Sequence, residues 1–544
     1  MTSGPLIVQS DKTALLEVDH PQAADARHDL SIFAELERAP EHIHTYRITR
    51  LGLWNARAAG HDSDFVLGVL DRYAKFAVPA GVRNEIVDTM SRYGRLSIIR
   101  NDEGRLLLHS TDRAVLLEAS KQPKISVLLE EPVGNEDFAI AAWARGQVKQ
   151  ELLKLGWPAE DFAGYAPGTP HDIALNEIGW NIRDYQSKAV EKFWEGGSGV
   201  VVLPCGAGKT IVGAGAMSVA KTNTLILVTN TVSARQWKSE LLKRTSLTED
   251  EIGEYSGSIK EIKPITIATY QILTTKSKGE FAHLALLNAN DWGLIIYDEV
   301  HLLPAPIFKM TADLQARRRL GLTATLVRED GKEGEVFSLI GPKRFDAPWK
   351  DIEAQGYIAP AACFEVRVDL PGDVRMDYAI ANQEDRYRLA ACATAKIDVI
   401  SELIKKHAGE PTLVIGQYLE QLHEVAESLN VPLITGQTPV DERERLFQGF
   451  RDGEIKTLVV SKVANFSIDL PEASVAIQIS GSFGSRQEEA QRLGRLLRPK
   501  ADGRAASFYT IISRDTVDQD FAQNRQRFLA EQGYSYEILD AHAI

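Results

Sequence analysis

The chain has 544 residues, which is too long for one hydrophobic core and predicts three or four domains. Its hydrophobic fraction of 44% and charged fraction of 25% are typical of a soluble globular protein, and no apolar run is long enough to span a bilayer. The net charge of −13 argues against nucleic acid as a partner, although a local basic channel can coexist with an acidic exterior.

The N-terminal residues and the cysteines indicate the compartment. The first residues lack the basic and apolar regions of a secretory signal. The cysteines, at positions 205, 363 and 392, are too few and too far apart for a disulfide framework or a cysteine-based zinc site. We therefore expect a cytoplasmic protein that does not associate with a membrane.

Two small units are predicted before the main part of the chain. The elements expected in the first are helices at 64–75 and 81–93, then strands at 95–100 and 105–109. Helices followed by a hairpin indicate a domain over residues 1–122 that is partly winged-helix-like, although unrelated small domains share this pattern. A helix at 144–155 indicates a second small α/β domain over residues 123–175. Pro167-Gly-Thr-Pro170 predicts a linker.

From residue 199 onward, short apolar strands alternate with helical stretches. The predicted strands are 199–203, 224–228, 265–268, 294–297 and 319–323, and the predicted helices include 211–220, 234–243 and 281–287. This alternation predicts a parallel sheet with helices on both faces, in a first lobe over residues 176–348.

The most informative local pattern is Leu203-Pro-Cys-Gly-Ala-Gly-Lys-Thr210, between an apolar strand and a helix. A phosphate-binding loop requires this order: a strand, a glycine-rich turn, Lys-Thr and a helix. The glycines let backbone N–H groups surround a polyphosphate, and the helix N-terminus adds partial positive charge. Lys209 would reach the β- and γ-phosphates, and Thr210 would hold Mg²⁺. Because Leu203 replaces the first glycine of the strict pattern, a turn that binds nothing remains the alternative for this motif alone.

Asp298-Glu-Val-His301 ends the predicted strand at 294–297. An acidic residue at the carboxyl edge of such a strand lies beside the phosphate loop in a doubly wound sheet. Asp298 would hold Mg²⁺ through water, and Glu299 would orient or deprotonate the attacking water. His301 would couple this site to the second lobe. A solvated turn is the alternative, but a phosphate loop in the same sheet makes it the weaker interpretation.

After residue 349 the alternation starts again, which predicts a second α/β lobe over residues 349–544 and a cleft between the lobes. The predicted strands are 412–415, 432–434, 457–460 and 475–479, and the predicted helices are 419–429, 441–450 and 487–497.

Gln491-Arg-Leu-Gly-Arg-Leu-Leu-Arg498 lies on the last of these helices. Arg495 and Arg498 are three residues apart and share one face. Two guanidinium groups facing the γ-phosphate across the cleft would stabilise charge in phosphoryl transfer. The alternative is a basic surface helix, which does not explain why Gly494 interrupts the helix at a cost of about 1 kcal/mol.

Basic residues also cluster at Arg317-Arg-Arg319, at Lys343-Arg344 and from 492 to 500. Each cluster could contact nucleic acid, and the alternative for each is a solvated helix face or strand end.

Taken together, these motifs resemble helicase superfamily 2, and more specifically the XPB-type DNA repair helicases in their prokaryotic form. The phosphate loop, the Asp-Glu-Val-His box, Thr323-Ala-Thr325 and the Gln-Arg-x-Gly-Arg-x-x-Arg helix occur in that family's order. The loop has the family's Leu-Pro-Cys form, and Arg328-Glu-Asp330 matches another family element. The resemblance covers roughly residue 178 to the C-terminus. It implies two tandem RecA-like lobes with doubly wound parallel sheets, preceded by small α/β and winged-helix-like domains, with a damage-recognition domain at 123–175.

The resemblance also implies roles for individual residues. Residues implied at the nucleotide, beside Lys209 and Thr210, are Arg183, Gln186 (which would read the adenine edge), Gly206, Ala207, Gly208 and Asp469. Residues implied along the nucleic acid are Thr229, Gln236, Trp237, Thr269, Tyr270, Arg328, Glu329 and Asp330. Gln491 would act in catalysis with Arg495 and Arg498, and Thr323 and Thr325 would link hydrolysis to lobe movement. For Trp237 and Tyr270, a place in the core is an equal alternative.

We therefore predict an ATP-dependent DNA helicase and translocase of 3′-5′ polarity that acts in DNA repair with ATP and Mg²⁺. The expected partners are double-stranded DNA with single-stranded or damaged segments and a nuclease, and the chain is expected to act as a monomer on DNA. One alternative is an ATP-gated translocase or scaffold that opens DNA for the nuclease with weak unwinding of its own. Another is an RNA helicase, against which Arg328-Glu-Asp330 and the N-terminal units argue.

Overall fold

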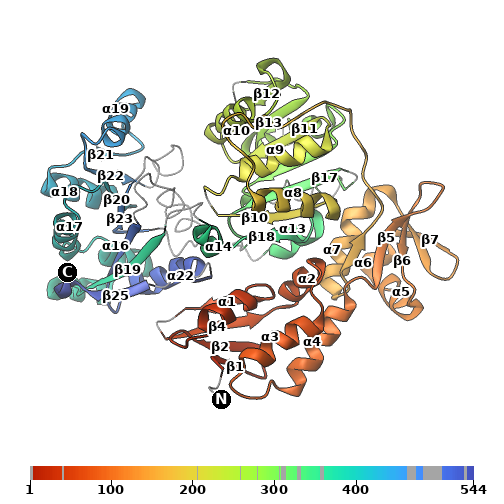
Figure 1. The fold of residues 1–544 in the computed structure, drawn as a ribbon, viewed down its shortest axis with the longest axis horizontal. Coiled ribbons are helices and arrows are strands. Elements are labelled where there is room, and N and C mark those ends of the chain that lie inside the picture. Colours follow the sequence, from red (N-terminus) through yellow and green to blue (C-terminus); the bar gives the residue numbers. More distant parts are fainter. Residues whose placement is uncertain are drawn as a thin grey trace.

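The computed structural model describes residues 4–39, 42–204, 206–257, 259–277, 280–304, 307, 311, 314–315, 317–326, 332–355, 360–461, 473–481, 505–531, 534 and 536–544. Figure 1 shows two α/β lobes beside each other, the first in yellow and green and the second in teal and blue, with the N-terminal unit in red below them. Within the described residues, no helix is both long and apolar enough to cross a membrane.

The N-terminal unit is a four-stranded antiparallel sheet with helices packed against it. Its strands, in the order β1-β2-β4-β3, are β1 (Leu6–Val8), β2 (Thr13–Glu17), β3 (Ala34–Arg38) and β4 (Ile43–Ile48). Its helices are α1 (Ala23–Leu30), α2 (Arg50–Ala58), α3 (Ser63–Tyr73) and α4 (Ala80–Arg92). The helices predicted at 64–75 and 81–93 are therefore present as α3 and α4.

The second unit is a five-stranded sheet in the order β7-β8-β6-β5-β9. Its elements are β5 (Leu96–Arg100), β6 (Leu106–His109), α5 (Arg113–Ser120), α6 (Pro123–Ser126), β7 (Leu129–Val133), β8 (Asp137–Ile140), α7 (Arg145–Leu155) and β9 (Ala159–Asp161). The predicted hairpin is present as β5 and β6, but β6 pairs with β8 and β5 pairs with β9. The expected boundary after residue 122 therefore divides a sheet, because these ladders join the hairpin to the strands that follow. The winged-helix interpretation stays a prediction.

The first lobe is a seven-stranded sheet in which every pairing is parallel, in the order β12-β13-β11-β16-β17-β10-β18. Its strands are β10 (Gly199–Val202), β11 (Thr224–Val228), β12 (Ile252–Tyr255), β13 (Ile265–Thr269), β16 (Leu294–Asp298), β17 (Arg318–Thr323) and β18 (Lys343–Asp346). Its helices include α8 (Asp184–Gly196), α9 (Lys209–Ala220), α10 (Thr231–Arg244), α11 (Tyr270–Thr274), α13 (Glu333–Leu339) and α14 (Trp349–Ala354). The two strands not predicted, β12 and β18, lie at the sheet edges.

The helix predicted at 281–287 is wrong. The chain instead pairs β14 (Lys276–Ser277) with β15 (Glu280–Phe281) and then forms the 3-10 helix η3 (Leu284–Asn288). Packing decides this conformation: Leu286 and Leu287 are buried, and the carbonyl of Leu286 accepts a hydrogen bond of 2.9 Å from the indole of Trp292.

The second lobe is another seven-stranded parallel sheet, in the order β21-β22-β20-β23-β24-β19-β25. Its strands are β19 (Ala361–Val368), β20 (Thr412–Gly416), β21 (Leu433–Ile434), β22 (Thr457–Ser461), β23 (Val475–Gln478), β24 (Ala506–Ser513) and β25 (Tyr536–Asp540). Its helices include α15 (Gly372–Ile380), α16 (Gln383–Ala391), α17 (Ala395–Lys406), α18 (Leu419–Leu429), α19 (Val440–Arg451) and α22 (Val517–Glu531). The helix predicted at 487–497 lies outside the described residues.

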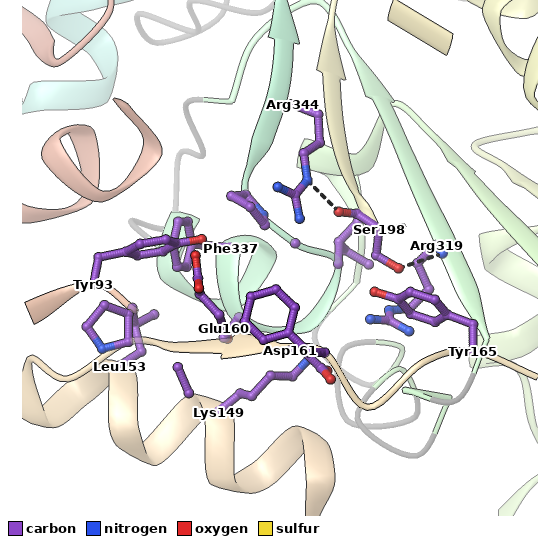
Figure 2. A pocket seen from close by; sticks show the side chains of 17 residues that line it. Tyr93, Lys149, Leu153, Glu160, Asp161, Tyr165, Ser198, Arg319, Phe337 and Arg344 are labelled. Atoms are coloured by element: carbon purple, nitrogen blue, oxygen red, sulfur yellow. Dashed lines mark hydrogen bonds and ion pairs between the residues drawn. The ribbon is translucent and has the colours of Figure 1, made fainter. Parts of the chain in front are cut away.

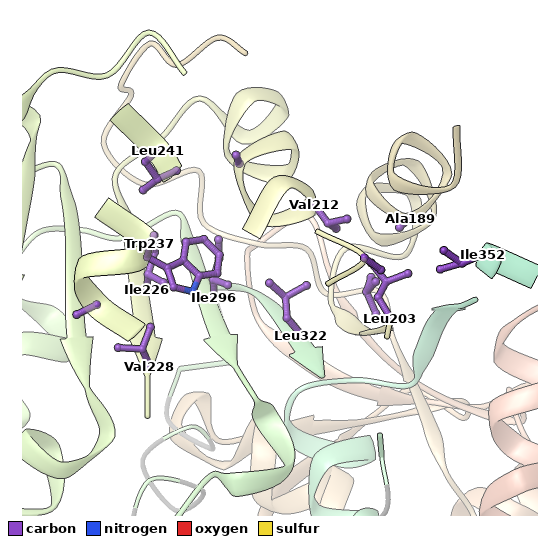
Figure 3. Packing of buried hydrophobic residues seen from close by; sticks show 14 of the residues in the cluster. Ala189, Leu203, Val212, Ile226, Val228, Trp237, Leu241, Ile296, Leu322 and Ile352 are labelled. Atoms are coloured by element: carbon purple, nitrogen blue, oxygen red, sulfur yellow. The ribbon is translucent and has the colours of Figure 1, made fainter. Parts of the chain in front are cut away.

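Burial on both faces explains the continuous apolar strands of the lobes. All five residues of β11 and of β13 are buried. On one face of the first sheet, α8, α9 and α10 contribute Ala189, Val212 and Trp237 to a cluster with the strand residues Ile226 and Ile296 (Figure 3). The packed sheet fixes where each strand ends, and its carboxyl edge carries the candidate site.

Two of the predicted basic clusters lie beside the junction between the first lobe and the second unit, where Arg319 and Arg344 line a pocket together with Lys149 and Asp161 (Figure 2). Arg319 is 1% exposed and donates hydrogen bonds to the carbonyls of Leu339 and Gln315, at 2.8 Å each. Arg318 stacks 3.9 Å from the ring centroid of Trp194, and Arg344 donates to the carbonyl of Ser198. These arginines are therefore structural. The third cluster, at 492–500, lies outside the described residues.

The N-terminal unit contacts both lobes. Asn55 on α2 accepts a hydrogen bond of 2.9 Å from the amide of Lys343 on β18, in the first lobe. Ala530 on α22, in the second lobe, is part of the apolar core of the N-terminal unit. The unit therefore bridges edge strand β18 of the first lobe and helix α22 of the second.

Candidate active site

The phosphate loop has the backbone conformation that its glycines allow. It joins β10 to α9, and Gly208 is the N-cap residue of α9. Gly206 and Gly208 have φ values of +81° and +84°, in the left-handed region that favours glycine. A Cβ atom on Gly208 would also overlap Nε2 of Gln186. The twelve-residue helix α9 therefore starts at a turn that is open to phosphate, with its positive end directed there.

Gln186 and Tyr185 at the start of α8 hold this loop. Gln186 is 3% exposed, and its Nε2 donates to the carbonyl of Ala207 at 2.8 Å. The Tyr185 hydroxyl donates to the same carbonyl at 2.6 Å. The Oε1 atom of Gln186 accepts from the backbone amide of Arg183 at 3.0 Å. The structure thus places Arg183 and Gln186 beside the loop, and contact with adenine stays a prediction.

The acidic box, Asp298-Glu-Val-His301, connects the phosphate loop to strand β17, which ends at Thr323. Lys209 Nζ lies 2.8 Å from Oε1 of Glu299, and Nδ1 of His301 lies 3.5 Å from Oε2 of Glu299. The same His301 nitrogen is 2.6 Å from the hydroxyl of Thr323, which in turn donates to the carbonyl of Thr325 at 2.6 Å. A continuous chain of contacts therefore joins the five residues Lys209, Glu299, His301, Thr323 and Thr325.

The two carboxylates of the box have pKa values moved in opposite directions. Burial, and secondly the charge of Glu299, raises the pKa of Asp298 to about 6. Burial also acts to raise the pKa of Glu299, but the charges of Lys209 and His301 outweigh it and lower that pKa. Glu299 adopts the left-handed conformation with φ +48°, which is uncommon outside glycine. Glu299 is therefore held ionised.

Asp298 accepts hydrogen bonds from two aromatic residues that were expected along the nucleic acid. The indole Nε1 of Trp237 donates to Oδ2 of Asp298 at 2.9 Å, and the hydroxyl of Tyr270 donates to its backbone carbonyl at 2.7 Å. Trp237 is 2% exposed and Tyr270 is 4% exposed, so both lie in the core, the alternative that the sequence left open for them. The pattern of residues held no signal for these hydrogen bonds, because they join helices α10 and α11 to a strand that is distant in sequence.

Three other residues expected along the nucleic acid lie at the same carboxyl edge. Gln236 on α10 is exposed, and Thr229 is partly exposed just before that helix. Thr269 is buried and caps α11 by accepting from the amide of Ile272. For these three residues contact with DNA stays a prediction.

Thr210 and Asp298 have the chemistry that Mg²⁺ requires. They supply hydroxyl and carboxylate oxygens, the ligand atoms this ion prefers. Both side chains are partly exposed rather than sealed in the core. The oxygens of Asp298 accept from Trp237 and from the amide of Glu299, which leaves lone pairs for a metal ion or its water.

Comparisons with known proteins agree with this site. Three family models match: "ERCC3/RAD25/XPB C-terminal helicase" over residues 352–543, "Type III restriction enzyme, res subunit" over 179–328, and "Helicase conserved C-terminal domain" over 6–132. A "DNA 3'-5' helicase XPB" of Kineococcus radiotolerans is 66% identical over 544 residues, which cover 100% of this chain and 98% of that protein. The chain belongs to the XPB family of DNA 3′-5′ helicases.

Two further relatives of this chain belong to the same family. The "DNA 3'-5' helicase XPB" of Mycobacterium tuberculosis is 63% identical, with 99% of this chain and 98% of that protein covered. A "General transcription and DNA repair factor IIH helicase/translocase subunit XPB" of Antonospora locustae is 34% identical, with 99% of this chain and 82% of that protein covered. The two parallel sheets are thus the RecA-like lobes of an ATP-dependent DNA helicase. A scaffold with weak unwinding is not favoured.

Several residues expected in this XPB site lie outside the described residues. They are Arg328, Glu329, Asp330, Asp469, Gln491, Arg495 and Arg498. The described half of the site, on the first lobe, comprises the phosphate loop, the acidic box and Thr323-Ala-Thr325.

Proposed function

We propose that this chain hydrolyses ATP at the phosphate loop of its first lobe, and that hydrolysis drives it along DNA with 3′-5′ polarity during repair. The observation that carries the proposal is the contact chain from Lys209 through Glu299 and His301 to Thr323. It connects the loop that would hold the phosphates to the strand end expected to signal lobe movement.

Each residue in this series of contacts has a proposed role. A phosphate at the loop competes with Glu299 for the ammonium group of Lys209, which frees Oε1 of Glu299 to accept a proton from water. The arginines Arg495 and Arg498 of the second lobe complete the charge stabilisation. Bound Mg²⁺ with ATP would supply the phosphoryl group and the positive charge that stabilises the leaving oxygens, and Thr210 and Asp298 would hold the ion.

The lowered pKa of Glu299 keeps its carboxylate ionised, which a proton acceptor requires. Glu299→Gln removes the proton acceptor but keeps the side-chain shape. We expect nucleotide binding to persist, while DNA-stimulated turnover falls by about 10²- to 10⁴-fold, the range for loss of a general base. Lys209→Ala should abolish both ATP hydrolysis and unwinding.

The measurement is ATPase activity with double-stranded DNA, single-stranded DNA and RNA side by side. Glu195→Gln makes the same chemical change in an exposed ion pair with Lys192 and should behave as the unmodified chain. DNA-stimulated hydrolysis that survives Glu299→Gln would exclude Glu299 as the base. Stimulation by RNA alone would contradict the DNA assignment.

The second unit lies beside the motor, at a place where it could contact the DNA substrate. We infer that the second unit contacts damaged or single-stranded segments beside the motor, since its helix α7 packs against α13 of the first lobe. A partner nuclease and action as a monomer stay predictions.

A further inference from the structure

The helices α10 and α11 occupy equivalent positions beside the ATP site. Each follows one of two paired parallel strands, β11 and β13, and begins at the carboxyl edge of the sheet. Each presents an exposed glutamine next to a buried aromatic residue: Gln236 beside Trp237 on α10, and Gln271 beside Tyr270 on α11. One residue therefore faces the surface where DNA is expected, and its neighbour faces the core.

Both buried aromatics reach the same aspartate. Trp237 donates its indole N–H to the Asp298 carboxylate at 2.9 Å, and Tyr270 donates its hydroxyl to the Asp298 carbonyl at 2.7 Å. Trp237 holds the side chain and Tyr270 holds the backbone of one residue. A shift of either helix therefore changes the surroundings of Asp298.

Close packing leaves Trp237 little freedom to move alone. A Cβ atom on Gly213 of α9 would lie 2.5 Å from the Trp237 ring, so the indole rests directly on the helix that follows the phosphate loop. Figure 3 shows the ring among Ile226, Val228 and Ile296. Because such interiors are packed to crystal-like density, a displacement of α10 is transmitted to its neighbours rather than absorbed.

We propose that Trp237 and Tyr270 are positioning residues through which DNA bound at α10 and α11 orients Asp298 for the metal–nucleotide complex. The inference rests on the proposed function, and it assigns the regulation of that site. It replaces the expected contact of Trp237 with nucleic acid: Trp237 transmits the presence of DNA without touching it.

The test removes one hydrogen-bond donor and keeps an aromatic side chain. Trp237→Phe loses the N–H group that binds Asp298, and Trp292→Phe is its matched control. Trp292 is also fully buried in the first lobe, and its indole donates to the carbonyl of Leu286 at 2.9 Å, away from Asp298. A general loss of core packing would affect both variants alike.

We expect the ratio of DNA-stimulated to DNA-free ATPase rate to fall about tenfold in Trp237→Phe, the effect of losing one hydrogen bond to a charged group. Trp292→Phe should keep the ratio of the unmodified chain. Tyr270→Phe, which removes the second donor, should lower the ratio in the same direction and tests the proposal if Trp237→Phe does not fold.

A binding measurement tests the same coupling without turnover. DNA affinity is measured by fluorescence anisotropy with and without a non-hydrolysable ATP analogue and MgCl₂. Linkage requires that DNA and nucleotide change each other's affinity by the same factor. We expect this factor to approach one in Trp237→Phe, while DNA affinity without nucleotide changes less than about twofold.

Two outcomes would overturn the inference: an unchanged stimulation ratio and coupling factor in Trp237→Phe, or an equal loss in Trp292→Phe. If the unmodified chain itself shows no stimulation by DNA, the proposed function fails instead. The two failures are therefore distinguishable.

Discussion

At the residue scale, the site depends on a few backbone positions that only certain residues tolerate. Gly208 combines a left-handed backbone with close approach to the amide of Gln186. Glu299 adopts a left-handed conformation without being a glycine and is held there by Lys209 and His301. Such strain is a common feature of functional sites. The pattern of glycines in the sequence anticipated the first position, but nothing in it indicated the second.

Gly208→Ala should weaken nucleotide binding by tenfold or more. The new methyl group would require a backbone conformation that costs an L-residue about 1–2 kcal/mol, and it would push Gln186 away from Ala207. A titration with a fluorescent adenine nucleotide measures the effect. Gly409→Ala is the control, because Gly409 has φ +87° with no atom within 4 Å of the added Cβ. Equal nucleotide affinity in the two variants would refute the role of the Gln186 contact.

At the element scale, parallel strands bring distant segments to one edge, and buried ion pairs dock helices onto sheets. In the second unit, Asp161 on β9 binds Arg145 of α7 at 2.7 Å and Lys149 of the same helix at 2.9 Å. Burial acts to raise the pKa of Asp161, but the two cations outweigh it and hold that pKa far below its usual range. These two ion pairs fix α7 beside the pocket of about 90 Å³ at the junction with the first lobe (Figure 2).

Asp161→Asn should destabilise the second unit by about 3–5 kcal/mol, the cost of leaving buried cations without their partner. Because the folded-state pKa of Asp161 is depressed, its contribution is present above the unfolded pKa of about 4 and is lost as the pH falls below it. Denaturation between pH 7 and pH 3 should therefore show the difference from the unmodified chain shrinking with acid. Glu131→Gln, in an exposed pair with Arg105, is the control and should change little. A difference independent of pH would contradict the ionised role of Asp161.

At the scale of the whole molecule, net charge and function point in opposite directions. The chain carries −13 formal charges, yet its family acts on a polyanion. The clusters at 317–319 and 343–344 do not resolve this contradiction, because Arg319 and Arg344 bind backbone carbonyls inside the first lobe. We expect DNA binding to depend on local contacts at the carboxyl edges of the lobes. The N-terminal unit, in contact with both lobes, adds a second link between them.

DNA affinity should fall steeply with salt despite the acidic exterior. Each phosphate contact releases condensed counterions, so six to ten contacts would cost about 10³- to 10⁵-fold in affinity between 50 and 200 mM salt. Anisotropy titrations over this range give the slope of DNA affinity against salt concentration. Binding of an adenine nucleotide in the absence of DNA serves as the comparison for general salt effects. A flat dependence would mean that phosphate contacts do not dominate binding.

The sequence by itself determined the two parallel lobes, the phosphate loop and the acidic box, because these depend on local order: apolar strand, turn, charged residue, helix. Strands β11 and β16 and helix α18 lie where their apolar patterns predict them. Only the tertiary structure decided that Trp237 and Tyr270 meet at Asp298, that Arg319 is buried at a junction, and that the β5–β6 hairpin belongs to the second unit. The physical reason is the same in each case. These contacts join residues far apart in the chain, so they depend on which strands become neighbours rather than on any local pattern.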